Sequence, residues 1–143
     1  MERTFTMVKP DGVARGLVGE VIRRYEGKGL VIIALRLRSF TTEDAAQFYA
    51  EHLGKGFYQS LIDLITTGPV VGMVLEGPNA VKLVRALIGS TNPQEAAPGT
   101  IRGDYGLELP ANIVHASDAP ASFAREAKLF FGEDPSLRAR EGL

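Results

Sequence analysis

One of the two histidines of this chain lies in a segment whose residue types suit group-transfer chemistry. His115 is the fourth residue of Asn112-Ile-Val-His-Ala-Ser-Asp118, after a short apolar run and before a predicted helix start. A histidine at a strand end is held by packed backbone while its ring can face a cleft. Neutral imidazole is a competent nucleophile or proton carrier near pH 7. The competing interpretation is a structural histidine hydrogen-bonded at the edge of the core. His52 has no evident partner, and we assign it no role.

A glutamate on the last predicted helix is a candidate partner for this histidine. Glu126 lies between two phenylalanines, on or beside the apolar stripe, where an unpaired carboxylate is costly. Pairing with His115 would fix the imidazole tautomer and orient the other ring nitrogen, and Ser117 could add a hydrogen bond. The alternative is a surface glutamate paired with Arg125 or Lys128.

Three cations have positions suited to holding phosphate. Lys9 ends the first predicted strand, Arg85 lies in an otherwise apolar helix, and Arg102 lies in a long loop. Guanidinium groups bind phosphate oxygens in a bidentate manner, although each cation taken singly is more often a solvated surface residue. Because neither the P-loop pattern nor G-x-G-x-x-G occurs, any nucleotide site must be built in another way.

An apolar pair is a candidate surface for stacking against a base. Phe57 and Leu61 follow the segment Gly54-Lys-Gly56, with Tyr49 and His52 nearby in the sequence. A phenylalanine at helical spacing from a leucine is more often a core residue, so both interpretations stay open at this point.

Composition restricts the class of protein. A chain of 143 residues with 45% hydrophobic and 23% charged residues is typical of one globular domain, here residues 1–143. The net charge of −1 argues against nucleic acid as a partner, and the lack of cysteine excludes disulfides and thiolate-bound zinc. No apolar run approaches the roughly 20 residues that span a bilayer, and the N-terminus does not read as a signal peptide. We therefore expect a cytoplasmic protein without a membrane partner.

The elements that must position these residues follow from periodicity and turn signals. Strands are predicted at Arg3–Lys9, Leu30–Arg38, Pro69–Glu76 and Ile113–His115, and helices at Leu17–Tyr25, Glu43–Glu51, Tyr58–Ile65, Asn79–Ile88 and Pro120–Phe131. The residues Pro10-Asp-Gly12 are predicted to break the chain, residues 90–111 to form a long functional loop, and residues 132–143 to form a tail. This order predicts an α+β sandwich, a four-stranded sheet with helices on one face.

Five collinear blocks resemble one family. Lys9-Pro-Asp-Gly-Val-Ala-Arg-Gly-Leu-Val-Gly19 is similar to the first motif of the nucleoside diphosphate kinases. The other blocks match that family in order and spacing, and the resemblance runs from Glu2 to about Phe131. They are Gly68-Pro-Val-Val71, Thr91-Asn-Pro93, Pro98-Gly-Thr-Ile-Arg-Gly-Asp104 and Asn112-Ile-Val-His115.

The resemblance implies a fold and a reaction. It implies a ferredoxin-like βαββαβ core with a four-stranded antiparallel sheet, and a ping-pong reaction in which His115 carries the γ-phosphoryl group of ATP or another nucleoside triphosphate to a nucleoside diphosphate. It makes Glu126 and Ser117 supports of the histidine, and Phe57 and Leu61 the base clamp. The implied nucleotide and phosphate ligands are Lys9, Tyr49, Arg85, Thr91, Arg102 and Asn112.

The resemblance also implies partners. Mg²⁺ is expected to bind mainly through nucleotide phosphates, because the chain has no dedicated carboxylate cage and we assign no metal-ligating residue. An apolar clamp without base-edge donors predicts broad base specificity, and the resemblance implies broad sugar specificity as well. Family members are homo-oligomers built from dimers, either hexamers or tetramers, and the sequence does not decide between them.

Two departures from the family pattern bear on the site. Ala116 replaces the usual glycine after the histidine; a positive φ there would strain alanine by roughly 1 kcal/mol, and we expect a negative φ. Gly56 replaces a proline before Phe57, which predicts a looser loop before the clamp.

Two other functions are compatible with the fold. A catalytically silent family member would lack the histidine or the cations, and all of these positions are filled. An RNA- or DNA-binding module would present a basic face with stacking aromatics, which the net charge argues against.

Overall fold

The sheet of this protein is antiparallel and has four strands in the order β2-β3-β1-β4. The computed structural model describes residues 1–134 and 137. The strands are β1 (Glu2–Val8), β2 (Val31–Arg38), β3 (Val70–Gly77) and β4 (Val114–Ala116). β1 pairs with both β3 and β4, and β2 pairs with β3 at the edge. The predicted ferredoxin-like arrangement is therefore confirmed, with β3 as a central strand.

The predicted helices are present, most within two or three residues of their expected bounds. The helices are α1 (Pro10–Ala14), α2 (Val18–Gly27), α3 (Thr42–Phe48), α4 (Tyr58–Ile65), α5 (Ala80–Ile88), α6 (Ile101–Tyr105) and α7 (Pro120–Phe131), with short 3-10 turns η1 (Ala50–His52) and η2 (Pro93–Glu95). α3 begins with a capping box, in which the Thr41 hydroxyl accepts from the Asp44 N–H and the Asp44 carboxylate accepts from the Thr41 N–H. Thr41 is therefore the N-cap of α3.

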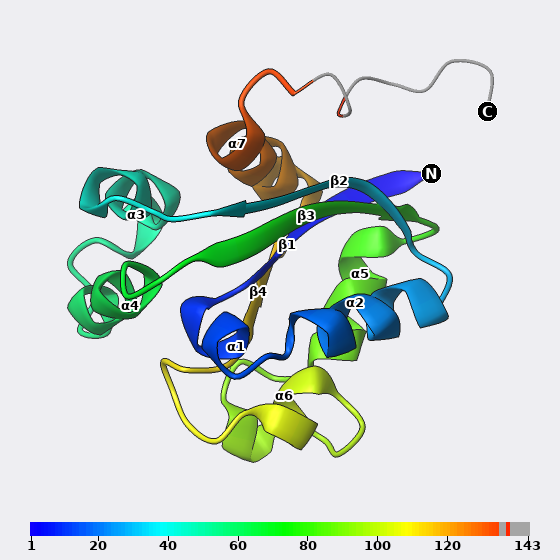
Figure 1. Cartoon of the computed structure of the whole chain (residues 1–143), viewed down its shortest axis with the longest axis horizontal. Coiled ribbons are helices and arrows are strands. Elements are labelled where there is room, and N and C mark those ends of the chain that lie inside the picture. The colour runs from blue at the N-terminus through cyan, green and yellow to red at the C-terminus, as the bar shows by residue number, and fades with distance from the viewer. Residues whose placement is uncertain (135–136, 138–143) are drawn as a thin grey trace.

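Helices cover both faces of the sheet, and the prediction of helices on one face was wrong. Figure 1 shows the sheet nearly edge-on, with α7 above it and α2 and α5 below it. One apolar cluster joins the sheet to α3, α4 and α7, and another joins it to α2, α5 and α6. The reason is visible in β1 and β3, where nearly every residue is buried, so neither strand alternates between a core face and a solvent face.

Two short helices were missed by the sequence patterns. α1 begins at Pro10, in a segment expected only to break the chain, and α6 lies in the segment expected to be a loop. Each has five residues, too few for hydrophobic periodicity to register. Proline in the first turn of α1 and the Thr100 side-chain cap of α6 are the local signals for them.

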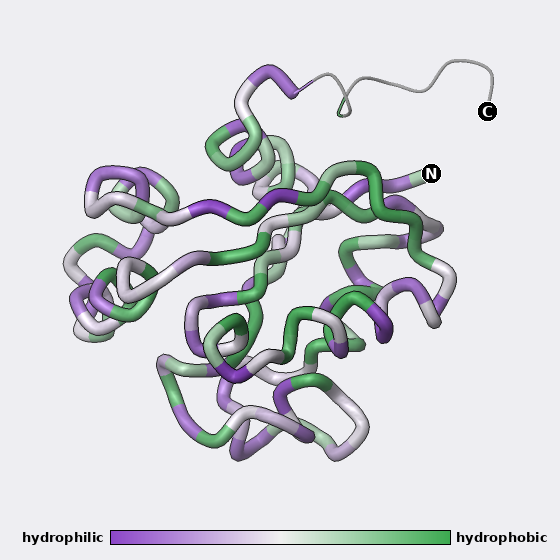
Figure 2. The backbone as a smooth tube through the Cα atoms, viewed as in Figure 1, coloured by the Kyte–Doolittle hydropathy of each residue, from purple (hydrophilic) through white to green (hydrophobic). Residues whose placement is uncertain are grey.

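Hydropathy agrees with this layered packing. In Figure 2 each longer helix has both hydrophobic and hydrophilic segments, as expected of helices with one face on the sheet. No helix in the described ranges is both long and apolar enough to cross a bilayer. Of the predicted tail, residues 135, 136 and 138–143 lie outside the described part of the chain.

Candidate active site

A pocket of about 580 Å³ lies where the C-terminal end of β1 meets β4, a volume suited to a small-molecule ligand. Except for Ser117, every residue predicted for the site lines it. The lining includes Lys9, Tyr49, Phe57, Leu61, Arg85, Thr91, Arg102, Asn112, His115 and Glu126. Ser117 is 1% exposed and is not part of the pocket lining.

Pairing between β1 and β4 brings the first block of the sequence to the histidine. Met7 is opposite His115 and Val8 is opposite Val114 in the register of the two strands. The next residue, Lys9, donates its backbone N–H to the carbonyl of Ile113 at 2.8 Å. Residues about one hundred positions apart therefore share one wall of the pocket.

His115, Glu126 and Ser117 form one hydrogen-bonded chain. Nε2 of His115 lies 2.5 Å from Oε2 of Glu126, and the Ser117 hydroxyl donates to Oε1 of the same carboxylate at 2.6 Å. The side chain of Glu126 is 4% exposed, whereas that of His115 is 23% exposed. Burial alone would raise the pKa of Glu126, but the hydrogen bond and charge of His115, with the Ser117 bond, leave it below its usual value.

This arrangement selects one ring nitrogen of the histidine. Since Nε2 is bonded to the carboxylate, Nδ1 is the nitrogen left to face a ligand, and within the described residues no protein group bonds to it. The rings of Phe48 and Tyr49 stand edge-on to the imidazole, with centroids 5.2 and 5.8 Å away. The ring is therefore held both by packing and by its carboxylate partner.

Lys9 and Asn112 form a second polar pair. Lys9 Nζ donates to Asn112 Oδ1 and to the Pro110 carbonyl, both at 2.7 Å, and Asn112 Nδ2 donates to the Thr91 carbonyl at 2.9 Å. Burial lowers the pKa of Lys9 to about 8, a shift that the charge of Asp11 partly opposes. An ammonium group with two neutral acceptors keeps an unneutralised charge at the pocket, which suits an anionic ligand.

Arg102 is more deeply built into the protein than its sequence position suggested. It is 5% exposed, and its guanidinium donates to three backbone carbonyls, those of Gly89, Asn112 and Val114. Burial lowers the pKa of Arg102 to about 10, to which the nearby charge of Arg85 contributes. This residue connects α6 to the start of β4, and it also lines the pocket.

The remaining predicted residues lie around the pocket mouth. Arg85 is exposed and donates to the Ala116 carbonyl at 3.3 Å, and Thr91 is exposed beside it. Phe57 is 50% exposed, and Leu61 lines the same side of the pocket. Tyr49 is buried, its hydroxyl has no hydrogen-bond partner among the described residues, and burial raises its pKa.

Sequence reasoning missed several residues of the pocket, among them three with polar side chains, His52, Asp118 and Ser122. His52 lines it, and its ring packs against Tyr49 and edge-on to Phe57. Asp118 and Ser122 line it as well and are hydrogen-bonded to each other. The sequence signal for His52 was its position between two predicted site residues; the other two lie three and seven positions after the histidine.

The backbone at Ala116, one of the two departures from the family pattern, does not have a positive φ. Among described non-glycine residues a positive φ occurs only at Asn79 and Ile113, so Ala116 is unstrained, as expected. The strained position lies instead at Ile113, two residues before the histidine.

Comparison with known sequences gives a consistent result. The family model described as nucleoside diphosphate kinase matches residues 2–135. The nucleoside diphosphate kinase of Archaeoglobus fulgidus is 62% identical over 134 residues, which covers 94% of this chain and 89% of that protein. That of Hyperthermus butylicus is 54% identical, with 94% of both chains covered.

Solved structures agree with the sequence comparison. The nucleoside diphosphate kinase of Halobacterium salinarum in complex with CDP has a TM-score of 0.93 at 48% identity, covering 98% of this chain and 93% of that chain. The enzyme from Encephalitozoon cuniculi also has a TM-score of 0.93, at 39% identity, covering 98% and 95% of the two chains.

Proposed function

Because this chain belongs to the nucleoside diphosphate kinase family and is a phosphotransferase, we propose that His115 carries the phosphoryl group between the two nucleotides. The observation that supports this assignment best is the bond between Nε2 of His115 and Glu126, which leaves Nδ1 as the nucleophilic nitrogen. Both the carboxylate and the ring packing hold the imidazole in one orientation, so attack needs no rearrangement of the ring.

The reaction has two balanced steps. Nδ1 of His115 attacks the γ-phosphorus of a nucleoside triphosphate, an N–P bond forms, the bond to the bridging oxygen breaks, and the nucleoside diphosphate leaves with that oxygen. A terminal oxygen of a second nucleoside diphosphate then attacks the same phosphorus, and the electron pair of the N–P bond returns to Nδ1. Glu126 accepts a hydrogen bond from the Nε2–H of His115 throughout and stabilises the positive charge that the ring develops.

The cations of the pocket hold and neutralise the phosphates. Phosphoryl transfer needs mainly alignment and stabilisation of charge on the transferred group. We assign this work to Lys9, Arg85 and Arg102, with hydrogen bonds from Thr91, Asn112 and Tyr49. The buried hydroxyl of Tyr49 has no hydrogen-bond partner among the described residues, which fits a role in binding a ligand.

Magnesium fits this site as an ion that is bound together with the nucleotide. Within the described residues, no three histidine, aspartate or glutamate side chains gather to hold a metal ion. Glu126 is engaged with His115 and Ser117, and Asp118 with Ser122. We propose that Mg²⁺ is held mainly by phosphate oxygens and water, where it supplies charge neutralisation.

The base is proposed to lie between Phe57 and Leu61. Stacking on an aromatic ring is tolerant of base identity, because every base has a π face. A relative solved in complex with CDP supports the expectation that this pocket accepts nucleotides. We therefore keep the prediction of broad base and sugar specificity, which competition among several nucleoside diphosphates would measure.

A homo-oligomer built from dimers is proposed from the edge of the sheet. β2 is an edge strand, and its Val31, Leu35 and Leu37 are 49%, 51% and 63% exposed. Unpaired strand edges with exposed apolar side chains favour association with another chain. Light scattering distinguishes a hexamer from a tetramer. A cytoplasmic location stays a prediction that cell fractionation tests.

The role of His115 is tested by labelling. Incubation with γ-labelled ATP is expected to give a label on His115 that is stable to base and labile to acid. His115→Gln removes the nucleophile while its amide can still donate to Glu126, so the variant should keep its melting temperature and lose the label and all turnover. Labelling or turnover that persists in His115→Gln would place the nucleophile elsewhere, and an unlabelled wild-type protein would indicate a silent family member.

A further inference from the structure

Ile113 has a backbone conformation that its side chain disfavours. Its φ is +72°, and its neighbour Val114 donates its N–H to the Asn112 carbonyl at 2.8 Å, which closes a three-residue turn around Ile113. The positive-φ form of this turn is rare and strained, and the strain is greatest for a β-branched residue. Such a conformation persists only where the surroundings hold it, and strained residues cluster at functional sites.

Two groups from the first block of the sequence hold this turn. The carboxylate of Asp11 accepts the Ile113 N–H at Oδ2, 2.9 Å away, and the Ile113 carbonyl accepts the backbone N–H of Lys9 at 2.8 Å. Both backbone polar groups of Ile113 are therefore bonded to Lys9 and Asp11, at the start of α1. A Cβ atom on Gly12 would lie 3.0 Å from the Ile113 carbonyl oxygen and 2.8 Å from Val8 Cγ1, so only glycine allows this close approach.

The turn lies between two residues to which we assign work. Asn112, just before Ile113, bonds to the Lys9 ammonium group, and His115 lies two residues after Ile113, at the centre of β4. A change from positive to negative φ at Ile113 would redirect the chain and move Asn112 relative to His115. An error of about 1 Å at a reacting group is enough to cost about a hundredfold in rate.

We infer that Asp11 is a positioning residue of the phosphoryl-transfer reaction, which holds Ile113 at positive φ and thereby sets the spacing of Asn112 and His115. This inference rests on the proposed role of His115. Asp11 does not line the pocket, so it acts through the turn. Its charge also raises the pKa of Lys9, and an experiment must separate that effect from the hydrogen bond.

Two substitutions at Asp11 separate the hydrogen bond from the charge. Asp11→Asn keeps an oxygen that can accept the Ile113 N–H, and Asp11→Ala keeps neither bond nor charge. Both substitutions remove the charge that raises the pKa of Lys9, so a difference between the two variants reports the hydrogen bond and not the charge. Asp11→Ala is expected to lower kcat/KM about tenfold or more, and kcat should fall as well. The kcat/KM of Asp11→Asn should stay within about threefold of the wild-type value. Asp63→Ala, on the exposed surface of α4, is the control for loss of a carboxylate.

The backbone strain is tested directly at Ile113. Ile113→Gly and Ile113→Ala remove nearly the same side chain from the core, but only glycine relaxes the cost of positive φ. If Asp11 works by holding the turn, adding Asp11→Ala should reduce kcat/KM about tenfold in the Ile113→Ala background and hardly at all in the Ile113→Gly background. Equal losses in the two backgrounds would overturn the inference.

Hydrogen exchange gives a readout that does not depend on activity. The Ile113 amide of the wild-type protein should be protected, and its protection should fall at least tenfold in Asp11→Ala but not in Asp11→Asn. Unchanged protection in Asp11→Ala would overturn the inference even if the Ile113 variants failed to fold. Failure of the proposed function appears differently, as absence of label on His115 in the wild-type protein.

Discussion

The carboxylate of Glu126 binds Nε2 of His115 at 2.5 Å with one oxygen and the Ser117 hydroxyl with the other. A carboxylate held by two donors cannot turn without breaking one of them, so the imidazole that it holds is also fixed. This explains why Glu126, at 3% exposure, lies in a position where an unpaired carboxylate would be costly. Orientation of the ring is therefore the property that depends on Glu126.

Removal of the carboxylate should slow the reaction without abolishing it. Glu126→Ala leaves the nucleophile in place but frees the ring to rotate, and we expect kcat to fall roughly 10–100-fold. Ser117→Ala removes one of the two donors and should cost about threefold to tenfold. Rapid-quench measurement of phosphoenzyme formation checks both. A Glu126→Ala variant with wild-type kinetics would mean that the pairing has no role in transfer.

The same carboxylate should make stability depend on pH. The pKa of Glu126 in the folded protein lies below its ordinary value of 4.5, so the stabilisation is complete above about 4.5 and is lost as the pH falls through the lower, folded-state value. Glu126→Gln has no such group. The free energy of unfolding of wild type relative to Glu126→Gln should therefore decrease between pH 5.5 and acid pH; a constant difference would contradict the assignment.

Lys9 should set an alkaline limit on activity. Burial lowers the pKa of Lys9 to about 8, and only the protonated amine attracts phosphate. The kcat/KM profile of the free enzyme should therefore fall above about pH 8. Lys9→Arg keeps its charge through this range and should lose that limb, although its shape will reduce the rate. An alkaline limb of the same midpoint in Lys9→Arg would assign the titration to another group.

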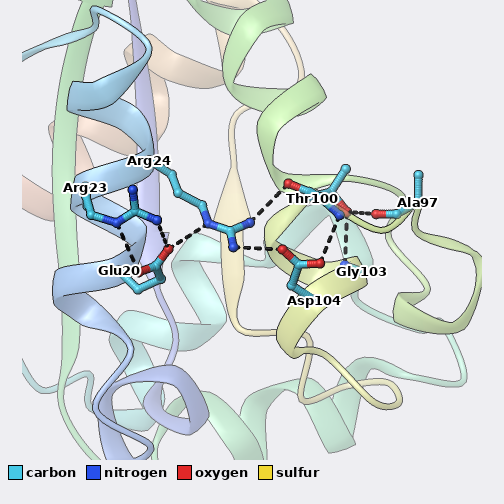
Figure 3. Close-up of polar contacts among 8 residues, drawn as sticks. Glu20, Arg23, Arg24, Ala97, Thr100, Gly103 and Asp104 are labelled. Atoms are coloured by element: carbon cyan, nitrogen blue, oxygen red, sulfur yellow. Dashed lines mark hydrogen bonds and ion pairs between the residues drawn. The ribbon is translucent and has the colours of Figure 1, made fainter.

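A network outside the pocket connects α2 to α6, the helix that carries Arg102. Arg24 bonds to Glu20 at 2.9 Å and to Asp104 at 2.7 Å, as drawn in Figure 3. It also donates to the Gly99 carbonyl at 3.1 Å. Asp104 also accepts the Gly99 N–H at 2.9 Å. The contacts of Arg24 with Asp104 and Gly99 attach residues 99–105, and with them Arg102, to α2.

Loss of this network should weaken nucleotide binding more than turnover. Arg24→Ala should destabilise the protein by about 1 kcal/mol and raise KM severalfold, with a smaller effect on kcat. Arg23→Ala is a matched control, because Arg23 bonds to the same Glu20 but its side chain is 70% exposed and does not reach α6. Equal effects of the two substitutions on KM would show that attachment of α6 is irrelevant to the site.

Ala116 should stabilise the end of β4. Its φ is not positive, so the glycine common in the family is not required by the backbone here. Ala116→Gly should lower the free energy of unfolding by about 0.5–1 kcal/mol, because glycine loses more backbone freedom on folding, while kcat changes by less than twofold. Chemical denaturation and steady-state kinetics measure the two effects. A gain in stability would mean that alanine is strained.

Most of the fold could be predicted from local patterns. The helix at Tyr58–Ile65 and the helix at Pro120–Phe131 have the predicted bounds, because turn residues and an apolar stripe mark them. The five-residue helices at Pro10 and Ile101 could not be found in this way. The placement of the longer helices on both faces of the sheet could not be predicted either. Which face of a strand is covered depends on packing partners that lie far away in the sequence.

The sequence alone determined which residues are present for the chemistry: one histidine with a serine two positions later, a glutamate on an apolar helix, and cations at 9, 85 and 102. Only the tertiary structure decided how they are used. Pairing of β1 with β4 brings Lys9 to Asn112, burial turns Arg102 toward three carbonyls, and Glu126 leaves Nδ1 of His115 as the reactive nitrogen. The physical reason is that residue type and local periodicity specify donors, acceptors and elements, whereas the partner of each donor depends on strand register and burial across the whole chain.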